Sequence, residues 1–334
     1  MTPVGTEVDI AVVGAGPAGL FAAYYAGFRG LSVAVIDSLP EPGGQISAMY
    51  PEKDILDVAG FPAVRGRELV DRLVAQAAPY KPAYLLGQPA ERLEAVGTPG
   101  RGGRFVIANS TGLSVRAGAV VITGGIGTFR PRPLPAAADF SGEGIAHFVR
   151  DPGEYDAADV VIVGGGDSAF DWADMLSDRA RTVTLVHRRT AFRAHAGTIE
   201  RVRAAGVGVI APAELITLRG GDRLEAVEIR SADGAFDVPC QKVIAALGFT
   251  ANLGPLLGWG IDIRDRRHIP VDTAMQTNIP GVFAAGDIND YPGKVRLIAV
   301  GFGEAATAVN NAAHFLDPRQ PVFPGHSTDA AAAA

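Results

Sequence analysis

Residues Val8–Gly19 read VDIAVVGAGPAG, and this segment is the strongest indication of the fold. It opens with a run of mostly apolar and β-branched residues, which is typical of a strand buried in a parallel sheet. A GxGxxG pattern follows at Gly14, Gly16 and Gly19, and an Ala-rich helix is predicted from there to about Phe28. In this setting the glycines permit a tight turn and a close approach of the backbone. The amides at the start of the helix then face an anion such as a pyrophosphate.

An acidic residue completes this first unit. A second buried strand is predicted over Ser32–Ile36, and Asp37 follows it immediately. A carboxylate at this position accepts hydrogen bonds from ribose hydroxyls, which favours FAD or NAD over NADP. The residues predicted to hold this nucleotide are Gly14, Gly16, Ala18, Gly19 and Asp37.

The same pattern recurs near the middle of the chain, with a different ending. A strand over Asp159–Val163 leads into the glycine-rich turn Gly164–Ser168, a helix to about Leu176 and a strand over Thr182–Val186. That strand ends in HRR rather than in an acid, and arginines select the 2′-phosphate of NADP(H) through charge-assisted hydrogen bonds. A solvated, charged turn is the alternative interpretation of the arginines. The residues predicted to bind NADP(H) are Gly164, Gly166, Asp167, Ser168, His187, Arg188, Arg189 and Arg193.

The composition narrows the class of protein. The 334 residues include 42 Gly and a single Cys, and the formal net charge is −6. One Cys excludes a disulfide framework, a cysteine-rich metal site and an intrachain CxxC pair, and no metal site is predicted. An acidic chain is not expected to bind nucleic acid. The uncharged run Ile10–Phe28 is interpreted as a buried strand, turn and helix, so the prediction is a cytoplasmic protein without membrane association.

Short runs of small residues divide the chain. Thr123–Gly125 and Ala246–Gly248 each end an apolar strand, and they are predicted hinges that bracket the second unit as an insertion in the first. Before the insertion, Phe105–Ala108, Leu113–Arg116 and Ala119–Ile122 are predicted to form a meander of separate strands. The predicted fold class is α/β, with two Rossmann-like, three-layer nucleotide-binding domains.

Several further motifs together resemble a known family. TNIPGVFAAGD at Thr277–Asp287 resembles the C-terminal FAD motif of the pyridine nucleotide-disulfide oxidoreductase superfamily. Other motifs resemble those of its thioredoxin-reductase-type (type 2) ferredoxin–NADP(+) reductases. These are PGGQ at Pro42–Gln45, YPEK at Tyr50–Lys53, DVAGFP at Asp57–Pro62, GGGDSAFDW at Gly164–Trp172, GFGEA at Gly301–Ala305 and HST at His326–Thr328.

The resemblance implies an architecture and an activity. Residues 1–126 and 250–334 would form a discontinuous FAD-binding domain, into which an NADP(H)-binding domain of residues 127–249 is inserted. The implied activity is a flavoprotein oxidoreductase that passes hydride from NADPH to FAD and then single electrons to ferredoxin or flavodoxin, reversibly in principle. A homodimer is expected on the same ground. Two other functions stay open: an NADPH-dependent FAD reductase of another acceptor, such as a quinone, and a non-catalytic redox sensor that binds FAD and NADP.

The resemblance also assigns roles near the flavin. Tyr50 is expected to stack on the isoalloxazine and His326 to cover its other face, and no acid or base residue is required for hydride transfer. A helix from about Gly303 is expected to direct its N-terminal dipole at the flavin, although a helix start needs no such role. The other FAD contacts expected from the resemblance are Gln45, Ala90, Phe129, Asp287 and Thr328.

Thioredoxin reductases carry a CxxC pair just before the second glycine-rich turn, and this chain has none. The corresponding stretch reads GIAHFVR at Gly144–Arg150, and the one thiol, Cys240, is predicted to be a small core residue. Without a dithiol relay, electrons must leave the flavin directly, which fits a carrier that takes one electron at a time. Arg65, Arg67 and Arg72 are candidates for a basic patch that steers an acidic ferredoxin, with merely solvated arginines as the alternative.

Overall fold

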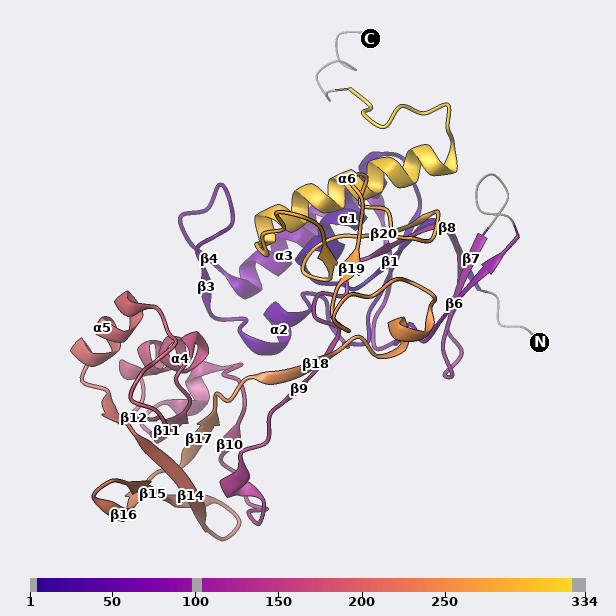
Figure 1. Cartoon of the computed structure of the whole chain (residues 1–334). Coiled ribbons are helices and arrows are strands. Elements are labelled where there is room, and N and C mark those ends of the chain that lie inside the picture. Colours follow the sequence, from indigo (N-terminus) through magenta and orange to yellow (C-terminus); the bar gives the residue numbers. More distant parts are fainter. Residues whose placement is uncertain (1–4, 98–103, 326–334) are drawn as a thin grey trace. The chain divides into compact units, whose positions relative to one another are not determined.

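The chain forms two compact units. The computed structural model describes residues 5–97 and 104–325 (Figure 1). One unit consists of Met1–Thr128 together with Ala251–Ala334, and the other of Phe129–Thr250. The chain therefore passes from one unit to the other and back, close to the predicted boundaries after residues 126 and 249.

A seven-stranded sheet forms the centre of the first unit. Strands β5, β2, β1 and β8 are parallel neighbours in that order, β20 also pairs with β8 in parallel, and β7 and β6 continue the sheet antiparallel. Side chains of β1 alternate between the two faces, so that Ile10 and Val12 join one buried cluster and Ala11 and Val13 join another. The strands are β1 (Thr6–Val13), β2 (Val33–Ile36), β5 (Ala83–Leu85), β6 (Arg92–Val96), β7 (Arg104–Ala108), β8 (Ser114–Ile122) and β20 (Val282–Ala284).

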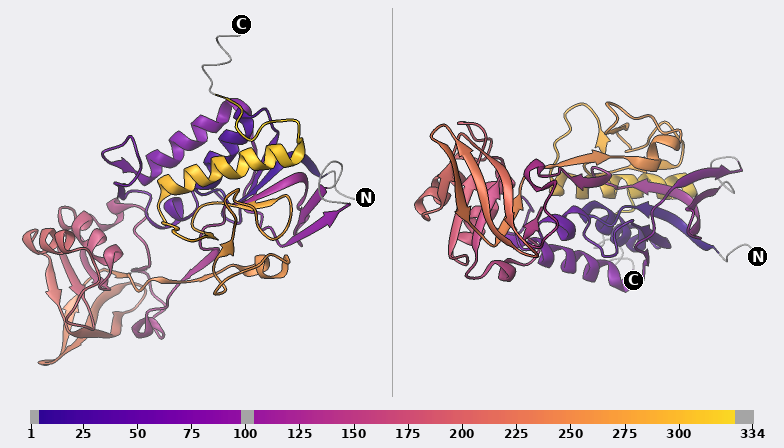
Figure 2. Two further views of the ribbon diagram at one scale, coloured as in Figure 1. Left: turned by 45° about the horizontal axis from the view of Figure 1, so that its top comes forward. Right: turned by 90° about the horizontal axis from the view of Figure 1, so that it is seen from below.

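Two helices, α1 (Pro17–Phe28) and α6 (Ile298–Leu316), lie side by side on one face of this sheet (Figure 1, Figure 2). Alanines such as Ala22 and Ala308 make up much of the buried cluster between them and the sheet, because small side chains let packed helices approach closely. The remaining elements of the unit are α2 (Gln45–Met49), α3 (Gly66–Ala77), η1 (Ala78–Tyr80), η4 (Gly254–Gly258), and the short paired strands β3 (Asp54–Ile55) with β4 (Val64–Arg65) and β19 (Ile269–Pro270) with β21 (Asn289–Asp290).

The second unit has a five-stranded parallel sheet in the order β10-β17-β11-β12-β13. Val160 and Ile162 of β11 pack against helices α4 and α5, whereas Val161 packs against the antiparallel sheet β14-β15-β16, which gives three layers. The elements are β10 (Ile145–Ala146), β11 (Asp159–Val163), α4 (Asp167–Ser177), β12 (Thr182–Val186), α5 (Ala196–Ala204), β13 (Gly208–Ile210), β14 (Ala213–Gly220), β15 (Leu224–Ser231), β16 (Gly234–Pro239), β17 (Lys242–Ala245), η2 (Pro135–Ala137) and η3 (Pro152–Tyr155). The strands β9 (Thr128–Pro131) and β18 (Phe249–Asn252) pair with each other where the chain passes between the units.

The predicted α/β class and the two strand–turn–helix–strand units are confirmed, and two element boundaries were wrong. The two strands predicted over Leu113–Arg116 and Ala119–Ile122 are one strand, β8 (Ser114–Ile122). The last helix begins at Ile298, not near Gly303, because Gly303 lies within the helix. The uncharged run Ile10–Phe28 divides into β1 and α1, and no helix among the described residues is long and apolar enough to cross a membrane.

Candidate functional site

The first glycine-rich turn joins β1 to α1 by close backbone packing. Gly14 has φ 116°, and a Cβ there would lie 2.6 Å from the carbonyl oxygen of Thr123. A Cβ on Gly19 would lie 1.9 Å from the carbonyl oxygen of Gly14, so no other residue fits. A Cβ on Gly16, by contrast, would meet nothing within 4 Å. Gly16 caps α1 without a side chain, so the first amides of the helix face open space where an anion can bind.

Asp37 ties the end of β2 to this turn. Its Oδ2 accepts a hydrogen bond from the amide of Ala15 at 2.6 Å, and its Oδ1 accepts one from the amide of Leu39 at 2.8 Å. Burial raises the pKa of Asp37, and these backbone donors act in the opposite direction. Each carboxylate oxygen has a second lone pair, so both can also accept a ribose hydroxyl. The amide of Gln88 donates to the carbonyl of Asp37 at 2.8 Å, which brings the segment that leads to Ala90 next to Asp37.

The PGGQ motif packs directly on the same turn. The amide of Gly43 donates to the carbonyl of Ala15 at 2.8 Å, and Gly44 lies against the main chain of Gly16. The amide nitrogen of the Gln45 side chain would be 2.9 Å from a Cβ on Gly125, which belongs to the predicted hinge Thr123–Gly125. Segments that are far apart in the sequence therefore meet next to the start of α1.

The Gly286–Asp287 turn approaches from a third direction. A Cβ on Gly286 would lie 3.1 Å from the Cβ of Ala18, and one on Gly301 would lie 3.4 Å from the Cα of Gly286. This contact places Asp287 near the first turns of both α1 and α6. The Asp287 side chain is partly exposed and accepts no hydrogen bond from the residues that the structure describes.

Tyr50 lies close enough to Asp287 for their electrostatic interaction to matter. The Tyr50 side chain is partly buried at the end of α2. Burial, followed by the negative charges of Asp287 and Asp57, raises the pKa of Tyr50 to about 12, so its hydroxyl stays protonated. The structure thus brings together Tyr50 and Asp287 from motifs at opposite ends of the chain.

The structure gives less information on the other residues that are expected to contact the flavin. Phe129 lies in β9, at the start of the second unit. His326 and Thr328 lie outside the described residues. The expectation that α6 directs its dipole from Gly303 is corrected, because its N-terminus is at Ile298 and Gly303 is one turn further in.

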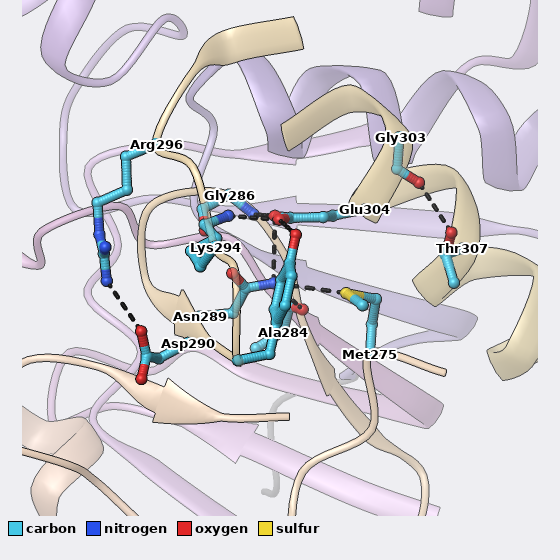
Figure 3. Close-up of polar contacts among 11 residues, drawn as sticks. Met275, Ala284, Gly286, Asn289, Asp290, Lys294, Arg296, Gly303, Glu304 and Thr307 are labelled. Atoms are coloured by element: carbon cyan, nitrogen blue, oxygen red, sulfur yellow. Dashed lines mark hydrogen bonds and ion pairs between the residues drawn. The ribbon is translucent and has the colours of Figure 1, made fainter. Parts of the chain in front are cut away.

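Sequence reasoning missed a buried ion pair beside Gly286. Lys294 and Glu304 lie 2.5 Å apart (Nζ to Oε1), and their side chains are 2% and 4% exposed (Figure 3). Glu304 was noticed only as part of the motif Gly301–Ala305. Its signal was a single charged residue on an otherwise apolar stretch of helix, which in a buried setting requires a partner.

The second unit contains a cleft of about 990 Å³ at the carboxyl ends of its parallel strands. It is lined by the glycine-rich turn Gly164–Ser168 after β11, by His187–Arg189 after β12 and by Ala246–Gly248 after β17. A dinucleotide binds in such a crevice in an open α/β sheet. Arg132 also lines the cleft, and its amide donates to the carbonyl of Gly248 at 2.9 Å; the sequence analysis had not singled it out.

Three arginines give this cleft a positive potential. Arg188, Arg189 and Arg193 are exposed, line the cleft and form no ion pair with any residue in the described ranges 5–97 and 104–325. Burial lowers the pKa of His187, and the positive charges of the three arginines lower it further. The His187 ring packs over the glycine-rich turn, so a Cβ on Gly165 would lie 2.4 Å from it.

The arginine-bearing loop is fastened to the glycine-rich turn at two points. The amide of Arg193 donates to the carbonyl of Gly165 at 2.8 Å, and the amide of His195 donates to Oδ1 of Asp167 at 3.0 Å. Asp167 therefore orients the loop, a role that the sequence had not indicated. Ser168 is exposed at the first turn of α4 and lines the cleft, and Gly166 has open space at its Cβ position.

The arginines proposed to steer a partner are neutralised locally. Arg65 and Arg67 both pair with Glu52, at 3.6 Å and 2.8 Å, and Arg72 pairs with Glu68 at 2.6 Å. These contacts favour the alternative interpretation of a solvated, ion-paired surface.

The single thiol is far from reactive. Cys240 is fully buried in the core of the second unit, with 0% exposure. Burial, and to a lesser degree the charge of Asp159, raises its pKa to about 12. A thiol with that pKa is protonated at neutral pH and is neither a nucleophile nor a redox relay.

Comparison with known proteins places the whole arrangement in a family. The family described as pyridine nucleotide-disulphide oxidoreductase matches residues 8–312. The chain belongs to this family. Among curated members of the family, this oxidoreductase is 62% identical over 324 residues to "Ferredoxin--NADP reductase" of Salinispora arenicola, covering 97% of this chain and 99% of that protein. It is 45% identical to the protein of the same name from Thermus thermophilus, covering 98% of both chains.

Solved structures support the same fold. The crystal structure of T. acidophilum thioredoxin reductase matches this oxidoreductase with a TM-score of 0.75 and 25% identity, over 91% of this chain and 96% of that chain. Lactococcus lactis thioredoxin reductase matches with a TM-score of 0.73 and 22% identity, over 92% and 98%. The predicted family resemblance and its two-domain fold are thereby confirmed.

Proposed function

We propose that this chain is a flavoprotein that transfers electrons between NADPH and ferredoxin or flavodoxin. The main support for the proposal is that the chain has a thioredoxin-reductase fold but lacks the pair of thiols that would relay electrons. The chain has one Cys, and Cys240 is buried with a raised pKa. Relatives that are 45% to 63% identical over nearly the whole chain are named "Ferredoxin--NADP reductase", which agrees with direct transfer.

The first unit has the features that FAD requires. Its open turn at Gly16 and the unfilled start of α1 suit a pyrophosphate, and Asp37 offers lone pairs to a ribose. Asp287 offers a carboxylate without another partner in the described chain to a ribitol hydroxyl, and Tyr50 offers a neutral ring for stacking. FAD, when bound, supplies the ability to accept a hydride and to release electrons singly. The proposed contacts are Gly14, Gly16, Ala18, Gly19, Asp37, Gln45, Tyr50, Ala90, Phe129, Asp287 and, in the tail, His326 and Thr328.

The second unit has the features that NADPH requires. The Gly164–Ser168 turn opens α4 and receives the pyrophosphate, while the arginines after β12 receive the 2′-phosphate. Asp167 and Arg193 hold the arginine loop in place through their contacts with His195 and Gly165. Protein side chains then act by positioning, desolvation and charge, and no acid or base takes part in hydride transfer.

Self-association into a homodimer is part of the proposal. Phe21, Tyr24 and Phe28 form an aromatic stripe along α1, and the Tyr80 ring joins it at 5.8 Å from the ring of Tyr24. Phe28 and Tyr80 are 41% and 39% exposed. Aromatic side chains are enriched at the cores of protein interfaces, so this stripe suits a second copy of the chain. A cytoplasmic location fits the same function, because ferredoxin and NADPH must both reach the protein.

Two measurements test the proposed function. Purified protein is expected to contain FAD, and NADPH-driven reduction of cytochrome c is expected to depend on added ferredoxin. Omitting ferredoxin gives the background, and Cys240→Ala serves as a control that retains full activity. Absence of ferredoxin-dependent turnover across several ferredoxins, with FAD bound and reducible by NADPH, would contradict the proposed acceptor.

A further inference from the structure

Gly286 has both of its main-chain polar groups bound by buried side chains. Its amide donates to Oε2 of Glu304 at 2.8 Å, and its carbonyl accepts from Nζ of Lys294 at 3.0 Å (Figure 3). Lys294 and Glu304 are in turn bonded to each other at 2.5 Å. The pair therefore holds the two successive peptide groups on either side of the Gly286 Cα.

The Glu304 carboxylate has no unused position. Oε2 accepts from the amide of Gly286 at 2.8 Å and from Nδ2 of Asn289 at 3.1 Å. Oε1 accepts from the hydroxyl of Tyr291 at 2.7 Å and from Nζ of Lys294 at 2.5 Å. A carboxylate offers about four acceptor sites, so these donors fix its orientation completely.

The second of these peptide groups joins Gly286 to Asp287. Gly286 has φ 82° and packs against Ala18 of α1 and Gly301 of α6, so the turn has little room to move. The Lys294–Glu304 pair adds directional bonds to that packing. A rotation of either peptide group would break one of these bonds, and a rotation of the Gly286–Asp287 peptide would re-aim Asp287.

Stability alone does not account for an ion pair at this depth. Replacing a buried ion pair by apolar side chains is often neutral or stabilising, whereas removing one partner is costly. Apolar side chains cannot, however, satisfy the amide of Gly286, and a buried unsatisfied group carries its own cost.

We propose that Glu304 and Lys294 are positioning residues, which clamp the two peptide groups that flank Gly286 and thereby aim Asp287 at the ribitol of FAD. The inference rests on the proposed FAD site. It adds to that site two residues that act through Gly286 and Asp287 and do not themselves contact the cofactor or the substrate. The property they control is the affinity for FAD, separately from the stability of the unit.

Two double variants separate positioning from stability. Lys294→Met with Glu304→Gln removes both charges but keeps an acceptor for the amide of Gly286. Lys294→Met with Glu304→Leu removes the charges and that acceptor. FAD is stripped from each protein, and FAD affinity of the apoprotein is measured by fluorescence titration, with thermal unfolding of the apoprotein in parallel. Asp290→Asn, at a partly exposed neighbour, disturbs the ion pairs to Arg264 and Arg296 and serves as the control.

We expect the Leu-containing variant to bind FAD about tenfold or more weakly than the Gln-containing variant, because it loses the acceptor for the amide of Gly286 and for Nδ2 of Asn289. The Leu-containing variant should unfold at a lower temperature because it leaves buried donors unsatisfied, but both apoproteins should be folded at the temperature of the titration, and the control should bind like the wild type. Equal FAD affinity in the two double variants, at a temperature where both are folded, overturns the inference. If the wild-type apoprotein itself binds no FAD, the proposed function fails instead, so the two failures are distinguishable.

Discussion

In an Arg188→Ala/Arg189→Ala variant, the Michaelis constant for NADPH is expected to rise about 100-fold, while that for NADH stays within about twofold of the wild type. Both guanidiniums are exposed in the cleft and have no acidic partner among the described residues, so a 2′-phosphate is their natural counterion. A charge-assisted hydrogen bond contributes about 1.5–3 kcal/mol. Because both arginines are exposed, we place the contribution of each near the lower end of that range. About 1.4 kcal/mol corresponds to a tenfold change in affinity, so the loss of both arginines should weaken NADPH binding about 100-fold.

Steady-state kinetics with NADPH and NADH and a fixed artificial acceptor provide the assay. The kcat with NADPH should change less than about threefold, since neither arginine meets the reacting atoms. Arg203→Ala is the matched control, because Arg203 is exposed on α5 of the same unit and does not line the cleft. Equal increases for NADPH and NADH would refute the assignment of the 2′-phosphate to these arginines.

Three further predictions follow from the same two units. Asp167→Ala removes the acceptor for the amide of His195, so the arginine loop should loosen and the preference for NADPH over NADH should fall about tenfold, as measured by the ratio of kcat/KM values; an unchanged ratio would show that Asp167 does not orient the loop. The folded-state pKa of His187 is lowered, so the unfolded chain binds its proton first as the pH falls through about 6.5, and stability is lost on acidification. Urea unfolding between about pH 7.5 and 5.5 should therefore show a shallower loss in His187→Gln than in the wild type, whereas identical slopes would contradict the shift. Cys240→Ala should keep wild-type turnover and lose no more than about 1–2 kcal/mol of stability, measured by activity and by urea unfolding; inactivation without unfolding would reveal a redox role.

The strands of both nucleotide-binding units could be predicted because they are buried on both faces. The predicted limits of β11 (Asp159–Val163) and β12 (Thr182–Val186) coincide with the observed ones. Such strands are continuous apolar runs that end at a glycine or at charged residues, so local sequence defines them well.

A glycine that serves tertiary packing lies at each of the two wrong boundaries. Gly118 falls between the two strands predicted over Leu113–Arg116 and Ala119–Ile122, and a Cβ there would lie 2.4 Å from Leu316, so this glycine makes room for the end of α6 within one continuous strand. Gly301 precedes the helix start predicted near Gly303, but it lies within α6 and allows the helix to approach Gly286. A sequence shows that a residue is small, but not which distant segment requires it to be small.

The residues of the candidate site also fall into those that the sequence predicts and those that it does not. Asp37 and Arg188 each come just after a strand of a nucleotide-binding motif. Their position in the motif, together with their charge, was enough to predict which part of the nucleotide each would contact. The Lys294–Glu304 pair and the contact between Asp167 and His195 depend on how loops pack in three dimensions. Neither has a fixed spacing, and so neither could be read from the chain alone.

In the proposed function, electrons leave this protein directly from bound FAD, without a thiol relay. The most direct test mixes NADPH-reduced protein anaerobically with oxidised ferredoxin and follows the absorbance of both partners in a stopped-flow instrument. We expect the flavin to be reoxidised while about two equivalents of ferredoxin are reduced per FAD, at the same rate in the wild type and in Cys240→Ala. Flavin that stays reduced in the presence of ferredoxin, or transfer that is lost in Cys240→Ala, would contradict it.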